Sequence, residues 1–139
     1  MSKNEATISY TLLALHSHLF VVDDVKEEVD APNKLSCKVD YLGMNEKNNS
    51  FGIVYTTAYY ATEPAKFSVL LSYAVLADFP DAYDADDVRS VYDETIDAIA
   101  KRVSLVISFI SDQVFGSPIS LPPKFDEIKR ESFDKHFQS

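Results

Sequence analysis

The period at which apolar residues recur changes once along this chain, and that change constrains the fold more than any other feature. Between Ile8 and Phe79 apolar and polar residues mostly alternate, which is typical of β-strands. After Pro80 the apolar residues recur at every third or fourth position, which is the period of an α-helix. Strands followed by helices predict an α+β fold rather than repeated β-α units.

The first half of the chain predicts a four-stranded antiparallel sheet. We expect the strands at 8–22, 35–41, 51–61 and 66–79. Short polar turns separate the later strands, as they do between antiparallel neighbours. The connection 23–34 is acidic, and it is long enough to cross over the sheet.

The second half predicts one long helix. It is expected to begin at Asp84 or Asp86, whose carboxylates can cap it, and to end at Gly116 and Pro118. One apolar stripe follows about eight turns and comprises Val88, Tyr92, Ile96, Ile99, Val103, Val106, Ile110 and Val114.

Three more apolar residues, Leu105, Ile107 and Phe109, widen this stripe towards a second face of the long helix. A helix that is apolar on two sides needs a second partner, so we expect the chain to self-associate. A short final helix is expected over 124–137.

The length and the net charge of the chain disfavour several classes of protein. The chain has 139 residues, of which 46% are hydrophobic, and this fits one domain over residues 1–139. Its 13 Lys and Arg against 22 Asp and Glu give a net charge of −9, which disfavours nucleic acid and anionic membrane surfaces as partners. No apolar run reaches the ~20 residues of a membrane-spanning helix. We therefore expect a soluble cytoplasmic protein with no membrane insertion.

The sequence offers no positive case for catalysis, for a cofactor or for a metal. With only 3 glycines, the Gly-rich motifs of hydrolases and nucleotide-binding enzymes are missing. His16 and His18 would project from one face of a strand, but a zinc site needs a third ligand, so ordinary strand histidines are favoured. Cys37 alternates with polar neighbours, which favours a small buried side chain over a nucleophile.

Two motifs resemble segments of the SecB family of protein-export chaperones. Asp30-Ala31-Pro32-Asn33 is similar to the acidic-Ala-Pro-Asn segment in that family's crossover region. The segment from Gly116 through Leu121 to Phe125-Asp126 resembles the family's linker between its long helix and last helix. The resemblance covers about residues 8 to 137. Two signatures expected early in the family's long helix are missing, so the chain resembles a divergent SecB-like protein.

The resemblance implies an ATP-independent holdase that binds unfolded polypeptides, such as preproteins for export. It implies a homotetramer, a dimer of dimers, with the long helices packed between two sheets. It implies client-binding grooves lined by Val25, Val29, Phe125, Ile128, Phe133 and Phe137. It also implies that an acidic outer face of the sheet, with Asp30 and Glu63, docks the export motor SecA.

Two alternatives remain open. Divergent SecB-like proteins also serve as dedicated chaperones of the antitoxin in a toxin–antitoxin pair. A different class is a small-molecule-binding or enzymatic α+β domain, which predicts a closed apolar pocket between the sheet and the long helix.

Overall fold

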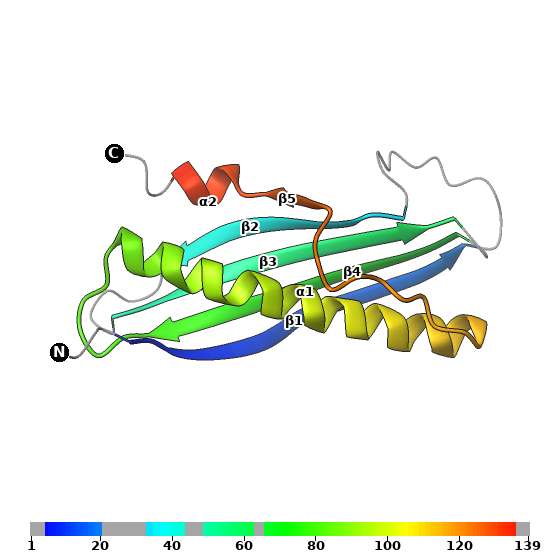
Figure 1. Ribbon diagram of the computed structural model, residues 1–139, viewed down its shortest axis with the longest axis horizontal. Helices are drawn as coiled ribbons and strands as arrows, with labels where there is room; N and C mark the ends of the chain where they lie inside the picture. The colour runs from blue at the N-terminus through cyan, green and yellow to red at the C-terminus, as the bar shows by residue number, and fades with distance from the viewer. Residues whose placement is uncertain (1–4, 21–32, 44–48, 63–65, 136–139) are drawn as a thin grey trace.

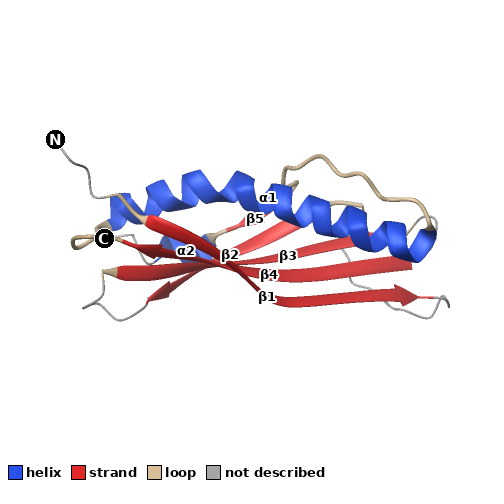
Figure 2. Ribbon diagram, turned by 90° about the horizontal axis from the view of Figure 1, so that it is seen from below, coloured by secondary structure: helices blue, strands red, loops and turns tan. Residues whose placement is uncertain are grey.

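A computed structural model describes residues 5–20, 33–43, 49–62 and 66–135. The elements in chain order are β1 (Thr7–Phe20), β2 (Leu35–Gly43), β3 (Ser50–Ala61), β4 (Lys66–Asp78), α1 (Ala85–Phe115), β5 (Glu127–Lys129) and α2 (Glu131–Lys135). The strands form one sheet, and α1 covers one of its faces (Figures 1 and 2). This confirms the predicted α+β class.

The sheet has the strand order β1-β4-β3-β2-β5. The first four strands pair antiparallel, as predicted, but β5 pairs parallel to β2 along Ser36–Lys38. The expectation of a purely antiparallel, four-stranded sheet is therefore wrong. The final helix is also shorter than expected, because residues 127–129 form this strand and α2 begins only at Glu131.

Asp126 fixes the position of β5 beside β2. Its backbone N–H donates to the carbonyl oxygen of Leu35 at 2.8 Å. Its carboxylate accepts a hydrogen bond from the backbone N–H of Leu35, also at 2.8 Å. This reciprocal pair brings the end of the linker to the start of β2, so that the next three residues run alongside it.

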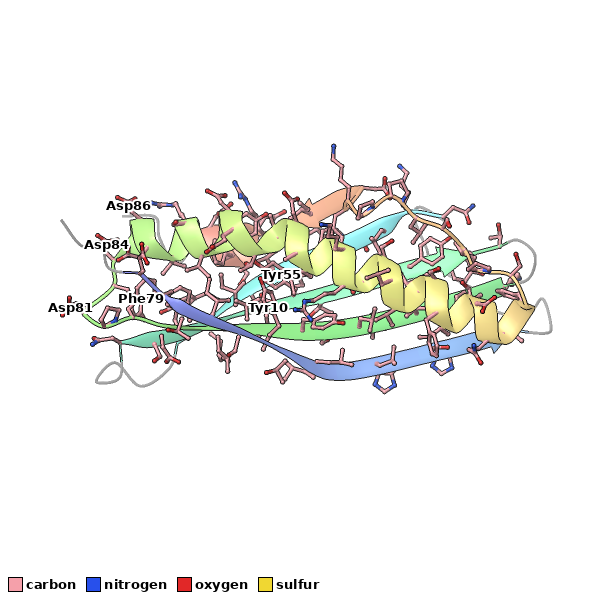
Figure 3. All side chains as sticks on the ribbon, turned by 60° about the horizontal axis from the view of Figure 1, so that its bottom comes forward. Tyr10, Tyr55, Phe79, Asp81, Asp84 and Asp86 are labelled. Carbon is pink, nitrogen blue, oxygen red and sulfur yellow. The ribbon has the colours of Figure 1, made fainter. Side chains whose placement is uncertain are left out.

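The core lies between α1 and the face of the sheet that α1 covers. On β2, β3 and β4 alternate residues are buried there, and the largest include Leu35, Ile53, Tyr55, Phe67 and Leu71. The helix contributes Val88, Tyr92, Ile99, Val103 and Ile107. Figure 3 shows Tyr10 and Tyr55 between the sheet and α1. The hydroxyls of Tyr55 and Thr95 are hydrogen-bonded at 2.7 Å, which satisfies the one polar atom that Tyr55 brings into the core.

The ends of α1 agree with the prediction. Asp84 is the N-cap, and its carboxylate accepts from the backbone N–H of Asp87 at 2.9 Å. The Asp87 carboxylate accepts in return from the Asp84 backbone N–H at 3.0 Å, which completes a capping box. Gly116 ends the helix with φ 73, a left-handed conformation that glycine adopts without a steric penalty. None of the helices within the described ranges has the length and apolar character needed to cross a bilayer.

Candidate interaction surface

Five large apolar side chains are exposed on β1 and α1, and we call them the β1/α1 surface. They are Leu12, Leu15 and Leu19 of β1 and Leu105 and Phe109 of α1. Leu105 is 70% exposed and Phe109 66% exposed, although both lie on the helix that packs against the sheet. Large apolar patches of this kind on a soluble chain mark interaction sites.

A β-bulge places the three leucines of β1 on the same face of the sheet. The register with β4 shifts between Leu12 and Ala14, so Leu13 is the extra residue. Leu12 pairs with Tyr73 before the bulge, and Leu15 and Leu19 pair with Leu71 and Phe67 after it. These three β4 residues are buried beneath α1. The β1 leucines therefore share the helix-covered face, yet they are 46%, 42% and 45% exposed.

The second half of α1 approaches this edge of the sheet. In Figure 1 the helix crosses the sheet obliquely, from the side of β2 at its start towards β4 and β1 at its end. The guanidinium of Arg102 lies 4.3 Å from the ring centroid of Tyr10. Phe109 comes two turns after Arg102 and so lies on the same flank. Leu105 comes one turn before Phe109 and therefore lies on the same side of the helix.

β1 is also the last strand of the sheet on this side. Its outer edge, 14 residues long, pairs with no other strand within the described residues. The backbone N–H and C=O groups along such an edge are a template for pairing with another strand. The β1/α1 surface thus combines apolar side chains with an open backbone edge.

The opposite flank of α1 is covered by the chain's own C-terminal part. The hydroxyl of Ser104 donates to the carbonyl of Leu121 at 2.8 Å, and the backbone N–H of Ile119 donates to the hydroxyl of Ser111 at 2.7 Å. The linker is therefore bonded along the second half of the helix.

Nearer the start of the helix, α2 packs on Tyr92. The rings of Phe133 and Tyr92 are 5.4 Å apart, and the guanidinium of Arg130 lies 5.2 Å from the Tyr92 ring centroid. Burial raises the pKa of the Tyr92 hydroxyl, while its hydrogen bond with Arg130 acts in the opposite direction. Phe133 and Arg130 thus cover the ring of Tyr92 on the β2 side of the fold.

The predicted client-binding residues differ in how exposed they are. Phe125 and Phe133 are buried in the core, at 7% and 1% exposure, whereas Ile128 is 41% exposed. Only Ile128 is thus on the surface among those described. Val25, Val29 and Phe137 lie outside the described residues, as do Asp30 and Glu63, the candidates for docking a motor protein.

The outer face of the sheet, opposite α1, differs from the acidic face that the resemblance implied. In the described part, strand alternation places three carboxylates there, on Asp40, Asp78 and Glu127, and three lysines, Lys38, Lys66 and Lys129. The charges on the described part of this face are balanced, and Asp30 and Glu63 are not among the described residues.

Cysteine and histidine, the residue types considered above for catalysis and metal binding, differ in their burial. Cys37 is 1% exposed, and burial, with a smaller effect of the nearby Asp40 carboxylate, raises the pKa of its thiol to about 12. This confirms it as a buried side chain. His16 and His18 are exposed on the outer face of β1. Across the described ranges, no three His, Cys, Asp or Glu side chains are grouped so that they could hold a metal ion.

Two cavities in the described part lie near the ends of the elements, and neither lies beneath the middle of α1. One of about 580 Å³ lies where β1 and α1 begin, and one of about 360 Å³ lies beside α2. Neither has the position that the small-molecule alternative requires.

The fold is similar to that of a solved SecB-like chaperone. Sequence comparisons with protein-family models and with curated proteins find no match. Among solved structures, this chain is similar to a SecB-like chaperone from Mycobacterium tuberculosis, which was solved in complex with a ChAD peptide from the HigA1 antitoxin. The TM-score is 0.62 and the sequence identity 12%, over 85% of this chain and 86% of that one. A protein of unknown function from Streptococcus agalactiae is similar with a TM-score of 0.49 and 12% identity, over 87% of this chain and 99% of that one. The chain therefore shares the fold of this SecB-like chaperone.

Proposed function

We propose that this protein is an ATP-independent, cytoplasmic chaperone that holds unfolded polypeptide. The proposal is supported by the SecB-like fold and by the exposed apolar side chain of Ile128 on β5. Binding of an unfolded chain needs exposed apolar groups, and the net charge of −9 keeps a protein with such groups soluble. The function requires no catalytic residue.

The β1/α1 surface is the proposed interface between copies of the chain. Two β1 edges related by a twofold axis would pair antiparallel, and such pairing brings the same leucines together from both copies. The exposed side of α1, with Leu105, then remains available to a second pair of protomers. This arrangement yields a homotetramer, a dimer of dimers.

Client binding is proposed at the other flank, beside β5. Ile128 is the exposed residue there, and Val25, Val29 and Phe137 extend the site in the proposal. Phe125 and Phe133 are buried in the core and support the site from beneath. An extended polypeptide would bind through several weak apolar contacts, whose sum gives tight but reversible binding.

We favour a chaperone that serves one dedicated client polypeptide. The similar chaperone from Mycobacterium tuberculosis was solved with a peptide from an antitoxin, and we propose a client of the same kind here. Preproteins for export, delivered to SecA, are the alternative client class.

Binding of a permanently unfolded protein tests the function. One labelled sample is α-lactalbumin that has been reduced and then blocked with iodoacetamide, and the other is the native, folded form. Fluorescence anisotropy measures the binding of each. We expect the wild-type protein to bind only the unfolded form. Equal or absent binding of both forms contradicts the proposal.

A pair of variants tests the site. Ile128→Asp is expected to weaken binding of the unfolded form, and Leu42→Asp serves as the matched control. Leu42 is 48% exposed, but strand alternation places it on the outer face of the sheet, away from β5. A loss of affinity in both variants, or in neither, contradicts the assignment of the site.

The client class is distinguished by co-expression. A dedicated chaperone should keep one polypeptide, encoded beside its own gene, soluble and should leave unrelated aggregating proteins unprotected. Protection of many unrelated polypeptides favours the general export role.

A further inference from the structure

The strand β1 carries no Asp, Glu, Lys or Arg in any of its 14 residues, whereas 25% of the whole chain is charged. Charged residues on an edge strand normally keep it from pairing with another strand. Two copies of this chain, each with a net charge of −9, would repel one another over most of their surface. The uncharged edge of β1 is therefore the place where a second copy meets the least repulsion.

The bulge at Leu13 leaves one regular stretch on β1, residues 14–20, whose register with β4 is continuous. In an antiparallel pair related by a twofold axis, residues equally far from the axis lie opposite each other. An axis at the middle of this stretch, Ser17, places Leu15 opposite Leu19 of the second copy on the helix-covered face. This register pairs the whole regular stretch with itself and sets leucine against leucine.

Two histidines of this stretch project from the outer face of β1. His16 and His18 are both exposed, and they pair with Leu70 and Ser68 of β4, which carry no charge. Lys66, two residues from Ser68, is a cation on the same face, but its long, flexible side chain lets the ammonium turn away from a bound metal ion. Residues two apart on a strand share a face, so one copy offers two imidazoles on one side.

The same register supplies the ligands that one copy lacks. Within the described residues of a single chain, no third His, Cys, Asp or Glu joins His16 and His18, and a zinc site needs three or four protein ligands. With the axis at Ser17, His16 of each copy lies opposite His18 of the other. The Cβ atoms of such opposite residues are about 4.5–5.5 Å apart. Four imidazoles, which suit zinc, nickel and copper ions, then surround the axis.

We propose that two copies of this chain, paired along β1, bind one divalent transition-metal ion between His16 and His18 of both copies. The site is incomplete in one copy and complete in the pair, so the ion stabilises the pair. The negative net charge of each chain favours the approach of a cation. The inference rests on the proposed pairing of two β1 edges and not on the binding of a client.

Calorimetric titration of the metal-free, full-length chain with Zn²⁺ tests the site. We expect the wild-type protein to bind one ion per two chains. His16→Gln with His18→Gln keeps polar side chains at both exposed positions but removes the imidazoles, and this variant should lose the binding. His136→Gln removes the remaining one of the three histidines and should bind as the wild type does. Absent binding, one ion per chain, or equal binding in the double variant overturns the shared site.

Sedimentation velocity separates the metal site from the interface. At a free Zn²⁺ concentration about tenfold above its dissociation constant, association of the wild type should become about tenfold tighter. The double variant should associate as the metal-free wild type does. If Zn²⁺ leaves the association of the wild type unchanged, the metal site is wrong and the proposed interface stands. If the wild type stays a single chain with and without Zn²⁺, the interface and the metal site both fail.

Discussion

The two flanks of α1 are completed in different ways. On the β2 side the C-terminal part of the chain completes the fold. There β5 extends the sheet, and the side chain of Phe133 in α2 is 1% exposed. On the β1 side Arg102 of α1 lies over the ring of Tyr10, but no later segment within the described residues is bonded there, and Leu105 and Phe109 stay largely exposed. One helix thus serves a closed core on one side and an open surface on the other.

The difference shows which part of the apolar surface is needed for folding and which part is left for partners. Side chains on the closed flank contribute to the stability of a single chain, since they are buried whether or not a partner is present. Side chains on the open flank contribute nothing until something covers them. Substitutions on the two flanks should therefore change different measurements.

The largest effect is expected on the closed flank. Phe133→Ala removes a fully buried ring that packs on Tyr92, and such truncations cost about 3–5 kcal/mol of unfolding free energy. Urea denaturation of the variant measures this loss. Leu42→Ala, at an exposed site, should change stability by no more than about 0.5 kcal/mol. A small effect of Phe133→Ala would show that α2 is not part of the core.

The next effect is expected on the open flank, in assembly rather than in folding. Leu105→Asp with Phe109→Asp places charges in the proposed interface and should weaken association more than about 30-fold, as removal of central contact residues does. Sedimentation velocity measures the change, and far-ultraviolet circular dichroism checks that the fold is kept. Unchanged association would place the interface elsewhere.

Raised pH should weaken the closed flank through Cys37, which lies on β2 opposite Ile128 of β5. Its thiol has a pKa of about 12 in the folded chain against an ordinary 9.0. The folded state therefore keeps a proton that the unfolded state has lost. Stability is complete below pH 9.0 and declines as the pH rises towards about 12, with a slope of up to about 1.4 kcal/mol per pH unit from this group.

Urea denaturation across this pH range measures the decline. Cys37→Ala removes the contribution of the thiol and should make the slope shallower, although buried tyrosines such as Tyr55, whose hydroxyl pKa burial also raises, add their own decline at higher pH. An identical slope in wild type and variant contradicts the burial of the thiol.

The smallest effect is expected beneath the middle of α1, between the two flanks. Tyr55→Phe removes the hydrogen bond to Thr95 and should cost about 1 kcal/mol. The effect stays small because the Thr95 hydroxyl also donates to the carbonyl of Val91 at 2.7 Å. Thr95→Val in the Tyr55→Phe background should then add less than it does in wild type, and a double-mutant cycle measures the coupling.

Local patterns in the sequence predicted most of the elements. Alternation gave the four long strands and the inward position of Cys37, and capping residues gave both ends of α1. These features depend on residues close together in the sequence, where the physical signal is strong.

The features that the sequence did not predict depend on distant contacts. β5 is held by the bonds between Asp126 and Leu35, and Phe133 is buried because it meets Tyr92. Simple alternation along β1 would place Leu12 and Leu15 on opposite faces, and only the bulge brings them together. The open surface therefore could not be located from the apolar pattern of the strand alone.

The most direct test of the account is the mass of the protein in solution, by light scattering on a sizing column, with and without a permanently unfolded polypeptide. The account predicts a mass of four copies of the 15.6 kDa chain, and a larger complex when the unfolded polypeptide is added. A mass of one chain that the unfolded polypeptide leaves unchanged would contradict both the open flank as an interface and the chaperone function.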